Sequence, residues 1–430
     1  MIELKRDSLH LSVRDPVATS MNFLNEIAGQ YPDAISLAAG RPHESFHSTA
    51  DITRYLDAYQ AHLARDGYGP DRIRTALLQY GRTNGQLGEL IARMLLIDEG
   101  ITVAPDAVAV TAGCQEAMAI ALRGLCRDPE DVVLAAEPCY VGLTGAARLL
   151  GISVVPVPEG DGGLEPRAVA EVARKVRAGG RRPRALYVVP TFSNPSGTTL
   201  DRAARLELLE VAETEDLLIL EDDPYGLFGL DDEPRPSLKA LDRRGRVVYL
   251  GTFSKSCFPG ARVGFLVADQ TVIDNSGHRR TLADELSAVK SMLSVNTSPI
   301  AQAVIGGMLV ASGCSLRRAA YDKTLLYRRN LRVLLEALDD EVPGSLRRDG
   351  AVAWNRPDGG YFVGLRVPFA ADVRLLELSA QEYGVLWTPM SFFYESGGTH
   401  AIRLACSALD PDEIREGVRR LVRLIVGQLR

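Results

Sequence analysis

No stretch of the sequence holds the roughly 18 to 20 consecutive apolar residues that a membrane-spanning helix needs. The first residues, Met-Ile-Glu-Leu-Lys-Arg-Asp, also lack the apolar core of a secretory signal. We therefore expect neither a membrane protein nor an exported one, and we expect the protein to work in the cytoplasm.

Cysteine is scarce and scattered. The six cysteines, at positions 114, 126, 139, 257, 314 and 406, include no CxxC pair. In a chain of this size they indicate reduced thiols instead of a disulfide framework or a metal site, so we predict no bound metal. Cys257 lies two residues after a lysine of interest, but core packing is the more common role of a free cysteine.

A strong excess of charge is also lacking. The formal net charge is −6, and the arginines are spread along the chain instead of forming one basic patch. We therefore expect no nucleic-acid partner. Hydrophobic residues make up 46% and charged residues 24%, as in an ordinary globular protein. A length of 430 residues is enough for one large domain and a smaller one.

Short apolar runs alternate with helical patterns between residues 103 and 265. This alternation predicts a parallel sheet covered by helices. Sheets of this kind bind ligands at the carboxyl ends of their strands. Polar residues and glycines follow several of the runs, so we expect a ligand site at that edge of the sheet.

A single lysine follows the apolar run 247–250, in the stretch Val-Val-Tyr-Leu-Gly-Thr-Phe-Ser-Lys-Ser-Cys-Phe-Pro-Gly-Ala-Arg. The run predicts a short buried strand. A Ser-Lys pair by itself most often lies on the surface. Packed among aromatic residues at a strand end, however, Lys255 would lose hydration, which lowers its pKa and frees an amine able to form a Schiff base. Thr252, Ser254 and Arg262 are candidate anion ligands beside it.

The motif Ser254-Lys255-x-x-x-Pro259-Gly260-x-Arg262-x-Gly264 resembles the cofactor-lysine motif of fold-type I pyridoxal-phosphate (PLP) enzymes, the class I/II aminotransferase family. Further similar motifs follow in the family's order between about residues 35 and 424, among them Leu-Gln-Tyr-Gly from residue 78 and Asn-Pro-Ser-Gly from residue 194. The subgroup of 2-aminoadipate and kynurenine aminotransferases is the most similar.

The resemblance implies an α/β fold with two domains. A large PLP-binding domain, residues 51–320, would hold a mostly parallel seven-stranded sheet flanked by helices. A smaller α+β domain would cover residues 321–430, joined by an N-terminal segment, residues 1–50, that lies over the active site. We also expect a short helix over 18–28 and a flexible insertion near the mouth of the site at 269–288.

The resemblance implies that PLP is the cofactor and that Lys255 holds it covalently. Asp222 would face the pyridine nitrogen and keep it protonated by opposite charge, and Tyr140 would stack on the ring. Asn194 and Tyr225 would bond the phenolate oxygen. Lys255, Asp222 and Tyr225 are therefore the expected catalytic residues.

The cofactor phosphate is expected at the start of a helix, because free backbone N–H groups there suit an anion. The residues implied for this site are Gly113, Cys114, Gln115, Thr252, Ser254 and Arg262. By the same resemblance, Tyr80 and Thr297 would reach the phosphate of the partner subunit. The expected active unit is then a homodimer with shared active sites.

The substrate is expected to bind through its α-carboxylate. Arg403 would hold the carboxylate in the fixed plane of its guanidinium group, with Gly40 and Asn194 beside it. Arg41 and His43 either contact the substrate or lie in a solvated loop. The pocket for the substrate side chain is expected near Arg41, Tyr68 and Phe392.

The predicted function is transfer of an amino group from an α-amino acid to a 2-oxo acid. One alternative is a PLP enzyme of another reaction type, either a β- or γ-elimination or replacement enzyme or a carbon–carbon bond-forming synthase. Another is a sensor domain with the same fold, although only about 35 residues precede the fold here. The sequence alone leaves the substrate side chain undetermined.

Overall fold

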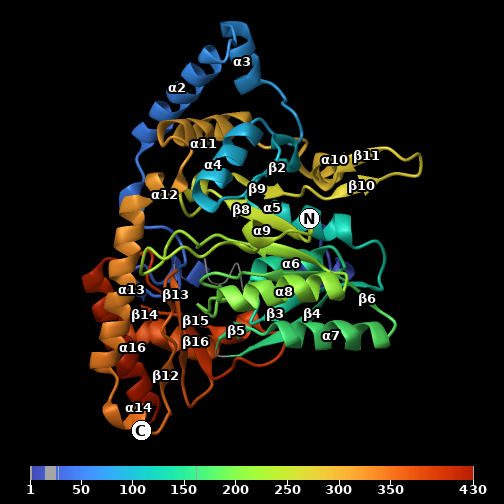
Figure 1. The fold of residues 1–430 in the computed structure, drawn as a ribbon. Coiled ribbons are helices and arrows are strands. Elements are labelled where there is room, and N and C mark those ends of the chain that lie inside the picture. The colour runs from blue at the N-terminus through green and yellow to red at the C-terminus, as the bar shows by residue number, and fades with distance from the viewer. Residues whose placement is uncertain (1, 15–25, 28, 161, 430) are drawn as a thin grey trace.

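The computed structural model describes residues 2–14, 26–27, 29–160 and 162–429 (Figure 1). The helix expected over 18–28 falls almost entirely outside these residues. Within the described residues, no helix is both long and apolar enough to cross a membrane.

The central element is an eight-stranded sheet in the order β2-β9-β8-β7-β6-β3-β4-β5. Its strands are β2 (Val108–Thr111), β3 (Asp131–Glu137), β4 (Ser153–Gly160), β5 (Gly163–Leu164), β6 (Arg182–Val188), β7 (Leu218–Asp222), β8 (Val247–Thr252) and β9 (Gly264–Val267). The pairs between β4 and β8 are parallel, while β2, β5 and β9 run antiparallel to their neighbours. The sheet has one strand more than the seven predicted, because the two-residue β5 extends its edge.

Helices cover both faces of this sheet, which explains why its inner strands are apolar throughout. Alternate strand residues, such as Leu220 and Val248, pack under α5 (Cys114–Leu125), α6 (Val141–Leu149) and α10 (Leu282–Ser294). Their neighbours Ile219 and Val247 pack on the other face with α7 (Pro166–Ala178), α8 (Arg202–Thr214) and α9 (Leu238–Leu241). The polar carboxyl ends of the strands therefore lie at one edge of the sheet, between the two layers of helices.

A second, antiparallel sheet has the order β12-β13-β16-β15. It contains β12 (Ala353–Trp354), β13 (Phe362–Arg366), β15 (Thr388–Pro389) and β16 (Ala401–Ala405). The surrounding helices are α13 (Tyr321–Glu341), α14 (Gly344–Arg348), α15 (Val373–Leu378), a π-helix (Ser379–Tyr383) and α16 (Pro411–Gln428). The N-terminal part joins this region, since β1 (Ile35–Ser36) pairs in parallel with β14 (Val385–Leu386).

The remaining helices form a layer beyond β2 and β9, at the top of Figure 1. They are α2 (Thr49–Arg65), α3 (Pro70–Leu78), α4 (Gly88–Glu99), α11 (Pro299–Ala311) and α12 (Leu316–Ala319). Helices α2 and α11 pack closely, because a Cβ atom on Gly307 would lie 1.7 Å from the carbonyl oxygen of Tyr55. Short 3-10 helices cover 6–8, 11–14, 44–46, 105–107, 259–261 and 390–393.

The stretch 269–288 is ordered secondary structure, contrary to the flexible insertion that we expected. Strands β10 (Thr271–Ile273) and β11 (Arg279–Thr281) form an antiparallel hairpin, and α10 follows directly. The hairpin projects away from the second sheet (Figure 1). Its polar sequence reflects two solvent-facing strands, and none of its residues lines the cavity around Lys255.

Candidate active site

A cavity of about 360 Å³ opens where the carboxyl ends of β6, β7 and β8 approach β16 and the residues after β1. Most of the predicted site residues line it: Gly40, Cys114, Gln115, Tyr140, Asn194, Asp222, Tyr225, Thr252, Ser254, Lys255, Arg262 and Arg403. The structure thus gathers side chains that are up to 363 positions apart in the sequence, as for Gly40 and Arg403.

Lys255 follows β8, and its side chain points into the cavity. Its Nζ atom donates a hydrogen bond to the carbonyl oxygen of Gly40 at 2.8 Å. Burial, together with the positive charges of Arg403 and Arg262, lowers the pKa of Lys255 to about 8. A sizeable fraction of this amine is therefore unprotonated, and hence nucleophilic, near neutral pH.

Asp222 is the last residue of β7 and is 3% exposed. Burial raises the pKa of its carboxyl group to about 6, and hydrogen bonds from Tyr187 and Cys114 oppose that rise. The Tyr187 hydroxyl donates to Oδ2 at 2.7 Å and the Cys114 thiol donates to Oδ1 at 3.3 Å. The carboxyl group remains largely ionised at pH 7.

A group of potential anion ligands lies beside the lysine. The guanidinium group of Arg262 donates to the Ser254 hydroxyl at 3.3 Å. The Ser254 backbone N–H donates to the Thr252 hydroxyl at 3.1 Å. Gly113, the N-cap of α5, has a φ of 81°, and a Cβ atom there would lie 2.4 Å from Arg262 Nη2. The helix start and the arginine therefore form a close cradle that only glycine permits.

The backbone N–H of Cys114, at the start of α5, is the group expected to bind the phosphate, and its side chain contacts another residue. Its backbone opens α5, but its thiol points to Asp222 and not toward Arg262. Gln115, the next residue, donates from Nε2 to the carbonyl oxygen of Gly142 at 2.6 Å. Burial raises the pKa of the neighbouring Tyr140 to about 12, so this ring in the cavity wall is neutral.

Arg403, on β16, is buried with 6% exposure. Its Nη1 atom donates to Asn194 Oδ1 at 2.6 Å, and Nη2 donates to the Ala38 carbonyl at 2.9 Å. Burial lowers the pKa of this arginine to about 10, so it is still a cation at neutral pH. Asn194 in turn donates from Nδ2 to the Tyr225 hydroxyl at 3.4 Å.

Aromatic rings flank this guanidinium group. The Cζ atom of Arg403 lies 4.4 Å from the centroid of the Phe362 ring and 4.8 Å from that of Phe393. Its buried Nε atom has no hydrogen-bond partner among the described residues. An unpaired donor of this kind is costly unless a ligand satisfies it, which points to an anionic substrate group at this position.

The two residues assigned to the partner's site behave differently. Tyr80 is 83% exposed and is available to another subunit. Thr297 is 2% exposed, and its hydroxyl donates to the carbonyl oxygen of Val110 at 3.1 Å. The Thr297 side chain therefore packs within its own subunit, next to β2, and its role toward the partner's phosphate stays a prediction.

Of the residues that we expected near the substrate, some line the main cavity and others lie outside it. Arg41 lines the main cavity, with only an exposed ion pair to Glu44 at 3.4 Å. Tyr68 lies elsewhere, under the guanidinium group of Arg72. The His43 backbone N–H donates to the Tyr327 hydroxyl, and His43 Nε2 lies 3.5 Å from Asp410 Oδ1. Cys257 packs in the apolar cluster below α11 instead of lining the cavity.

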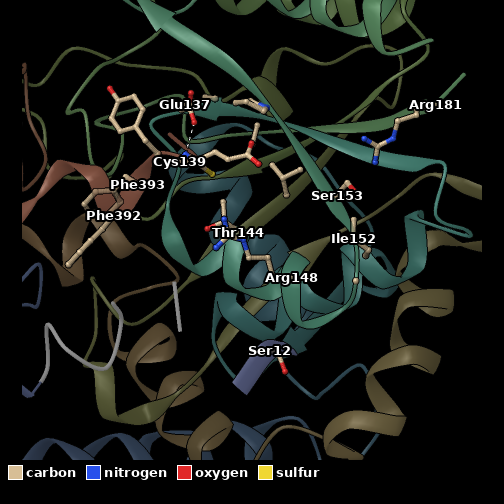
Figure 2. A pocket seen from close by; sticks show the side chains of 17 residues that line it. Ser12, Glu137, Cys139, Thr144, Arg148, Ile152, Ser153, Arg181, Phe392 and Phe393 are labelled. Carbon is tan, nitrogen blue, oxygen red and sulfur yellow. Dashed lines mark hydrogen bonds between the residues drawn. The ribbon is translucent and has the colours of Figure 1, made fainter. Parts of the chain in front are cut away.

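Phe392 lines a second cavity, of about 520 Å³, which adjoins the first through the shared residue Phe393. Figure 2 shows this cavity, with Phe392 and Phe393 on one side of the view and Arg181 on the other. Cys139 and Glu137 lie close to the phenylalanines, where the Cys139 N–H donates to the Phe393 carbonyl at 2.8 Å. The second cavity therefore borders the wall of the first.

Several residues of the cavity were not predicted from the sequence. They are Ala39, Met118, Val141, Val189, Pro224, Phe362 and Phe393. Tyr187 does not line the cavity, but its hydroxyl donates to Asp222. Its only sequence signal is its position within β6, in the buried run that leads to Asn194, and buried tyrosines in strands are common.

The residues fit a PLP site. A lysine with a lowered pKa, an acid across the cavity, an aromatic wall and an arginine–glycine anion cradle match the aldehyde, the pyridine nitrogen, the ring and the phosphate of this cofactor. The fold and the site together therefore define an α/β enzyme that binds PLP.

The chain belongs to the class I and II aminotransferases, since the family model "Aminotransferase class I and II" matches residues 64–421. It is 48% identical to (S)-3,5-dihydroxyphenylglycine transaminase of Amycolatopsis orientalis, over 100% of this chain and 96% of that protein. It is 33% identical to 2-aminoadipate transaminase of Thermus thermophilus, over 82% of each chain.

Solved structures of aminotransferases have a similar fold. The α-aminoadipate aminotransferase LysN of Thermus thermophilus, complexed with N-(5′-phosphopyridoxyl)-L-leucine, matches with a TM-score of 0.78 and 29% identity over 98% of both chains. The protein is accordingly a PLP-dependent aminotransferase that acts on α-amino acids. These relatives are transaminases, which favours transamination over the alternatives of a lyase, a synthase or a sensor domain.

Proposed function

We propose that the amino donor or product of this aminotransferase is an aromatic α-amino acid, and in particular an arylglycine, whose ring is attached directly to the α-carbon. The observation that carries this proposal is the 48% identity, over the full chain, to a transaminase of (S)-3,5-dihydroxyphenylglycine. The amino group is exchanged with a 2-oxo acid.

The walls of the cavity support an aromatic substrate. Phe362 and Phe393 lie on the guanidinium group of Arg403, and Tyr140 and Val141 lie nearby in the same wall. In an arylglycine the ring lies one bond from the carbon that bears the carboxylate. A carboxylate bound by Arg403 therefore brings the ring against these apolar side chains, where offset or edge contacts between rings are favourable.

Each residue of the site has a defined role in this proposal. Lys255 holds PLP, Asp222 faces the pyridine nitrogen, Tyr140 covers the ring, and Asn194 and Tyr225 bind the phenolate oxygen. The phosphate is held by the start of α5 at Gly113, Cys114 and Gln115, and by Thr252, Ser254 and Arg262. When bound, PLP draws electrons away from the substrate α-carbon.

The chain's own groups orient the substrate and move one proton. Arg403 binds the α-carboxylate with the Nε donor that now lacks a partner, and this fixes the direction of the Cα–H bond. Gly40 leaves room beside the carboxylate, because a Cβ atom there would lie 2.6 Å from Phe362 Cζ. Lys255 Nζ, once free, takes the proton from the substrate Cα as general base. Its lowered pKa suits that step near neutral pH.

The active unit in this proposal is a homodimer in which Tyr80 completes the site of the partner subunit. Large apolar side chains are exposed around Tyr80, at the ends of α3 and α10 and at the start of α11: Leu78, Met292, Leu293, Val295 and Ile300. Because α11 packs on α3, and a Cβ atom on Gly81 would lie 3.9 Å from Asn296 Nδ2, these side chains belong to one region of the surface. Exposed apolar surface of this kind marks an interface.

Two further expectations remain part of the proposal. The division into 1–50, 51–320 and 321–430 is supported by the separate apolar cluster of the second sheet, which includes Leu37 and Ala38 from the N-terminal segment. A cytoplasmic location is supported by the cysteines, all six of which are free thiols.

The test is a panel of amino acids with the purified holoprotein. (S)-3,5-dihydroxyphenylglycine, phenylglycine, phenylalanine and 2-aminoadipate are compared by the change in absorbance of the bound PLP and by oxo-acid formation with a 2-oxo acid acceptor. We expect kcat/KM for an arylglycine to exceed that for 2-aminoadipate by at least about tenfold. Equal or faster turnover of 2-aminoadipate, whose side-chain carboxylate would reach Arg41, would refute the proposal.

A further inference from the structure

The carboxylate of Asp222 has a side-chain donor on each of its two oxygens. The Tyr187 hydroxyl donates to Oδ2 at 2.7 Å, and the Cys114 thiol donates to Oδ1 at 3.3 Å. Tyr187 and Asp222 are buried, at 2% and 3% exposed, and Cys114 is partly buried in the cavity wall. The acid is therefore fixed from two directions before any ligand is bound.

The fold explains how these donors reach the acid. In the parallel pair of β6 and β7, Tyr187 lies opposite Leu220. Since alternate residues of a strand share a face, Leu220 and Asp222 point to the same side of the sheet, and the long Tyr187 side chain spans the distance to the carboxylate. Cys114 approaches from the other direction because Gly113 turns the chain sharply into α5.

We propose that Tyr187 and Cys114 are positioning residues that hold the Asp222 carboxylate in one orientation and keep it ionised. This inference rests on the proposed role of Asp222 opposite the pyridine nitrogen. In this proposal the Cys114 thiol binds the Asp222 carboxylate, and the backbone N–H groups at the start of α5 bind the cofactor phosphate.

The electrostatic surroundings make these donors necessary. Burial is the largest influence that raises the pKa of Asp222. The hydrogen bonds from Tyr187 and Cys114 are the largest influences that lower it. Burial and the nearby carboxylate keep the pKa of the tyrosine and of the thiol well above their ordinary values, so both stay protonated donors over the working pH range.

Other titratable groups face Asp222 as well. They are Asp223 and Lys255, and the neutral groups of Cys139, Tyr140, Tyr225 and Tyr249. Asp223 raises the pKa of Asp222, whereas Lys255 lowers it. With PLP on the Lys255 amine, the effect of the lysine charge on the pKa of Asp222 would change. The neutral Tyr187 hydroxyl and Cys114 thiol would still donate to the carboxylate and stabilise its ionised form.

The experiment compares holoprotein variants Tyr187→Phe, Cys114→Ala and Cys114→Ser. Bound PLP per subunit, PLP affinity, kcat and the absorbance of bound PLP are measured between pH 5 and 9. Tyr187→Phe removes only a hydroxyl, so we expect full PLP content, with the acidic limb of the kcat profile and the absorbance titration moved up by about one pH unit. Cys114→Ala should give a smaller shift in the same direction, and Cys114→Ser, whose hydroxyl can also donate to Asp222, should give a smaller shift than Cys114→Ala.

Tyr249→Phe is the matched control, because it removes another buried phenol, whose hydrogen bond is to Asp223 and not to Asp222. It should leave the acidic limb in place. Unchanged titrations in both Tyr187→Phe and Cys114→Ala would overturn the inference, as would weaker PLP binding in Cys114→Ala and Cys114→Ser without a pH shift. The absorbance titration needs no substrate, so it can succeed even if the arylglycine assignment fails.

Discussion

Arg403 Nη1 donates a hydrogen bond to Asn194 Oδ1 at 2.6 Å, and this bond joins the second sheet to the end of β6. Asn194 is in this way fixed as an acceptor toward the arginine and as a donor toward Tyr225. The same amide thus links the group that would hold the substrate carboxylate with the group that would hold the cofactor oxygen. A movement between the two sheets would therefore alter the contact of Arg403 with Asn194.

Replacement of Arg403 by lysine should weaken substrate binding selectively. Lysine keeps the charge but loses the planar set of donors and the contacts with Phe362 and Phe393. Since a hydrogen bond to a charged group contributes about 1.5–3 kcal/mol, we expect kcat/KM to fall by about 10- to 100-fold, with PLP content unchanged. Steady-state kinetics with an aromatic amino acid measure this. Arg366→Lys, at an exposed position of β13, should match the wild type, and an equal loss there would contradict the assignment.

Lys255→Ala should abolish both turnover and the covalent attachment of PLP. Borohydride reduction of the wild-type holoprotein should leave the cofactor on the peptide that contains Lys255, as seen by mass spectrometry. The variant should show no such adduct, whereas Lys175→Ala, in the exposed part of α7, should keep it. An adduct on another lysine, or activity at the native rate in Lys255→Ala, would refute the role of this residue.

The rate at which the apoprotein takes up PLP should rise with pH, with a midpoint near pH 8. The pKa of Lys255 is lowered to about 8, so the ammonium form dominates below that pH and the nucleophilic amine above it. Because the charge of Arg403 helps to lower this pKa, Arg403→Gln should move the midpoint upward. The growth of PLP absorbance in stopped-flow mixing provides the rate. A midpoint near 10.5, the ordinary value for lysine, would mean that the amine is not desolvated.

A homodimer with shared sites predicts complementation between two defective variants. Lys255→Ala and Tyr80→Ala subunits, each of low activity alone, should form hybrids in which one site has both residues. Random assembly should restore about a quarter of the wild-type activity, since half of the dimers are hybrids with one complete site. The control is Lys255→Ala mixed with Arg262→Ala, two residues of one subunit's own cavity, which should restore nothing. No recovery in the first mixture would place Tyr80 outside the partner's site.

Arg205→Met should destabilise the fold. Arg205 is 1% exposed, and it donates to the carbonyl oxygens of Leu200, Pro190 and Pro236 and to the Thr191 hydroxyl. A methionine would remove the guanidinium donor from each of these acceptors, although the Pro190 carbonyl would still accept from the Leu200 N–H, at a cost of about 3 kcal/mol or more in the free energy of unfolding. Urea unfolding at one fixed protein concentration measures the change. Arg202→Met, at an exposed position of the same helix, should have little effect; an equally small effect at Arg205 would contradict this account.

The pattern of buried strands and polar strand ends was readable from the chain, because burial on both faces makes parallel strands apolar throughout. That pattern, together with the family resemblance, placed Lys255, Asp222 and Asn194 at one edge of the sheet. The hairpin at 271–281 was misjudged, since both of its strands face solvent and a polar sequence there looks like an irregular loop.

The sequence by itself determined the chemistry of this protein: the lysine, the acid and the anion ligands are local motifs whose residue types carry their reactivity. Only the tertiary structure decided which groups surround them. Tyr187 reaches Asp222 through the register of two strands, Cys114 turns its thiol to the same acid, and Phe362 and Phe393 enclose Arg403. Such contacts join residues far apart in the chain, and their geometry follows from side-chain packing that local patterns do not encode.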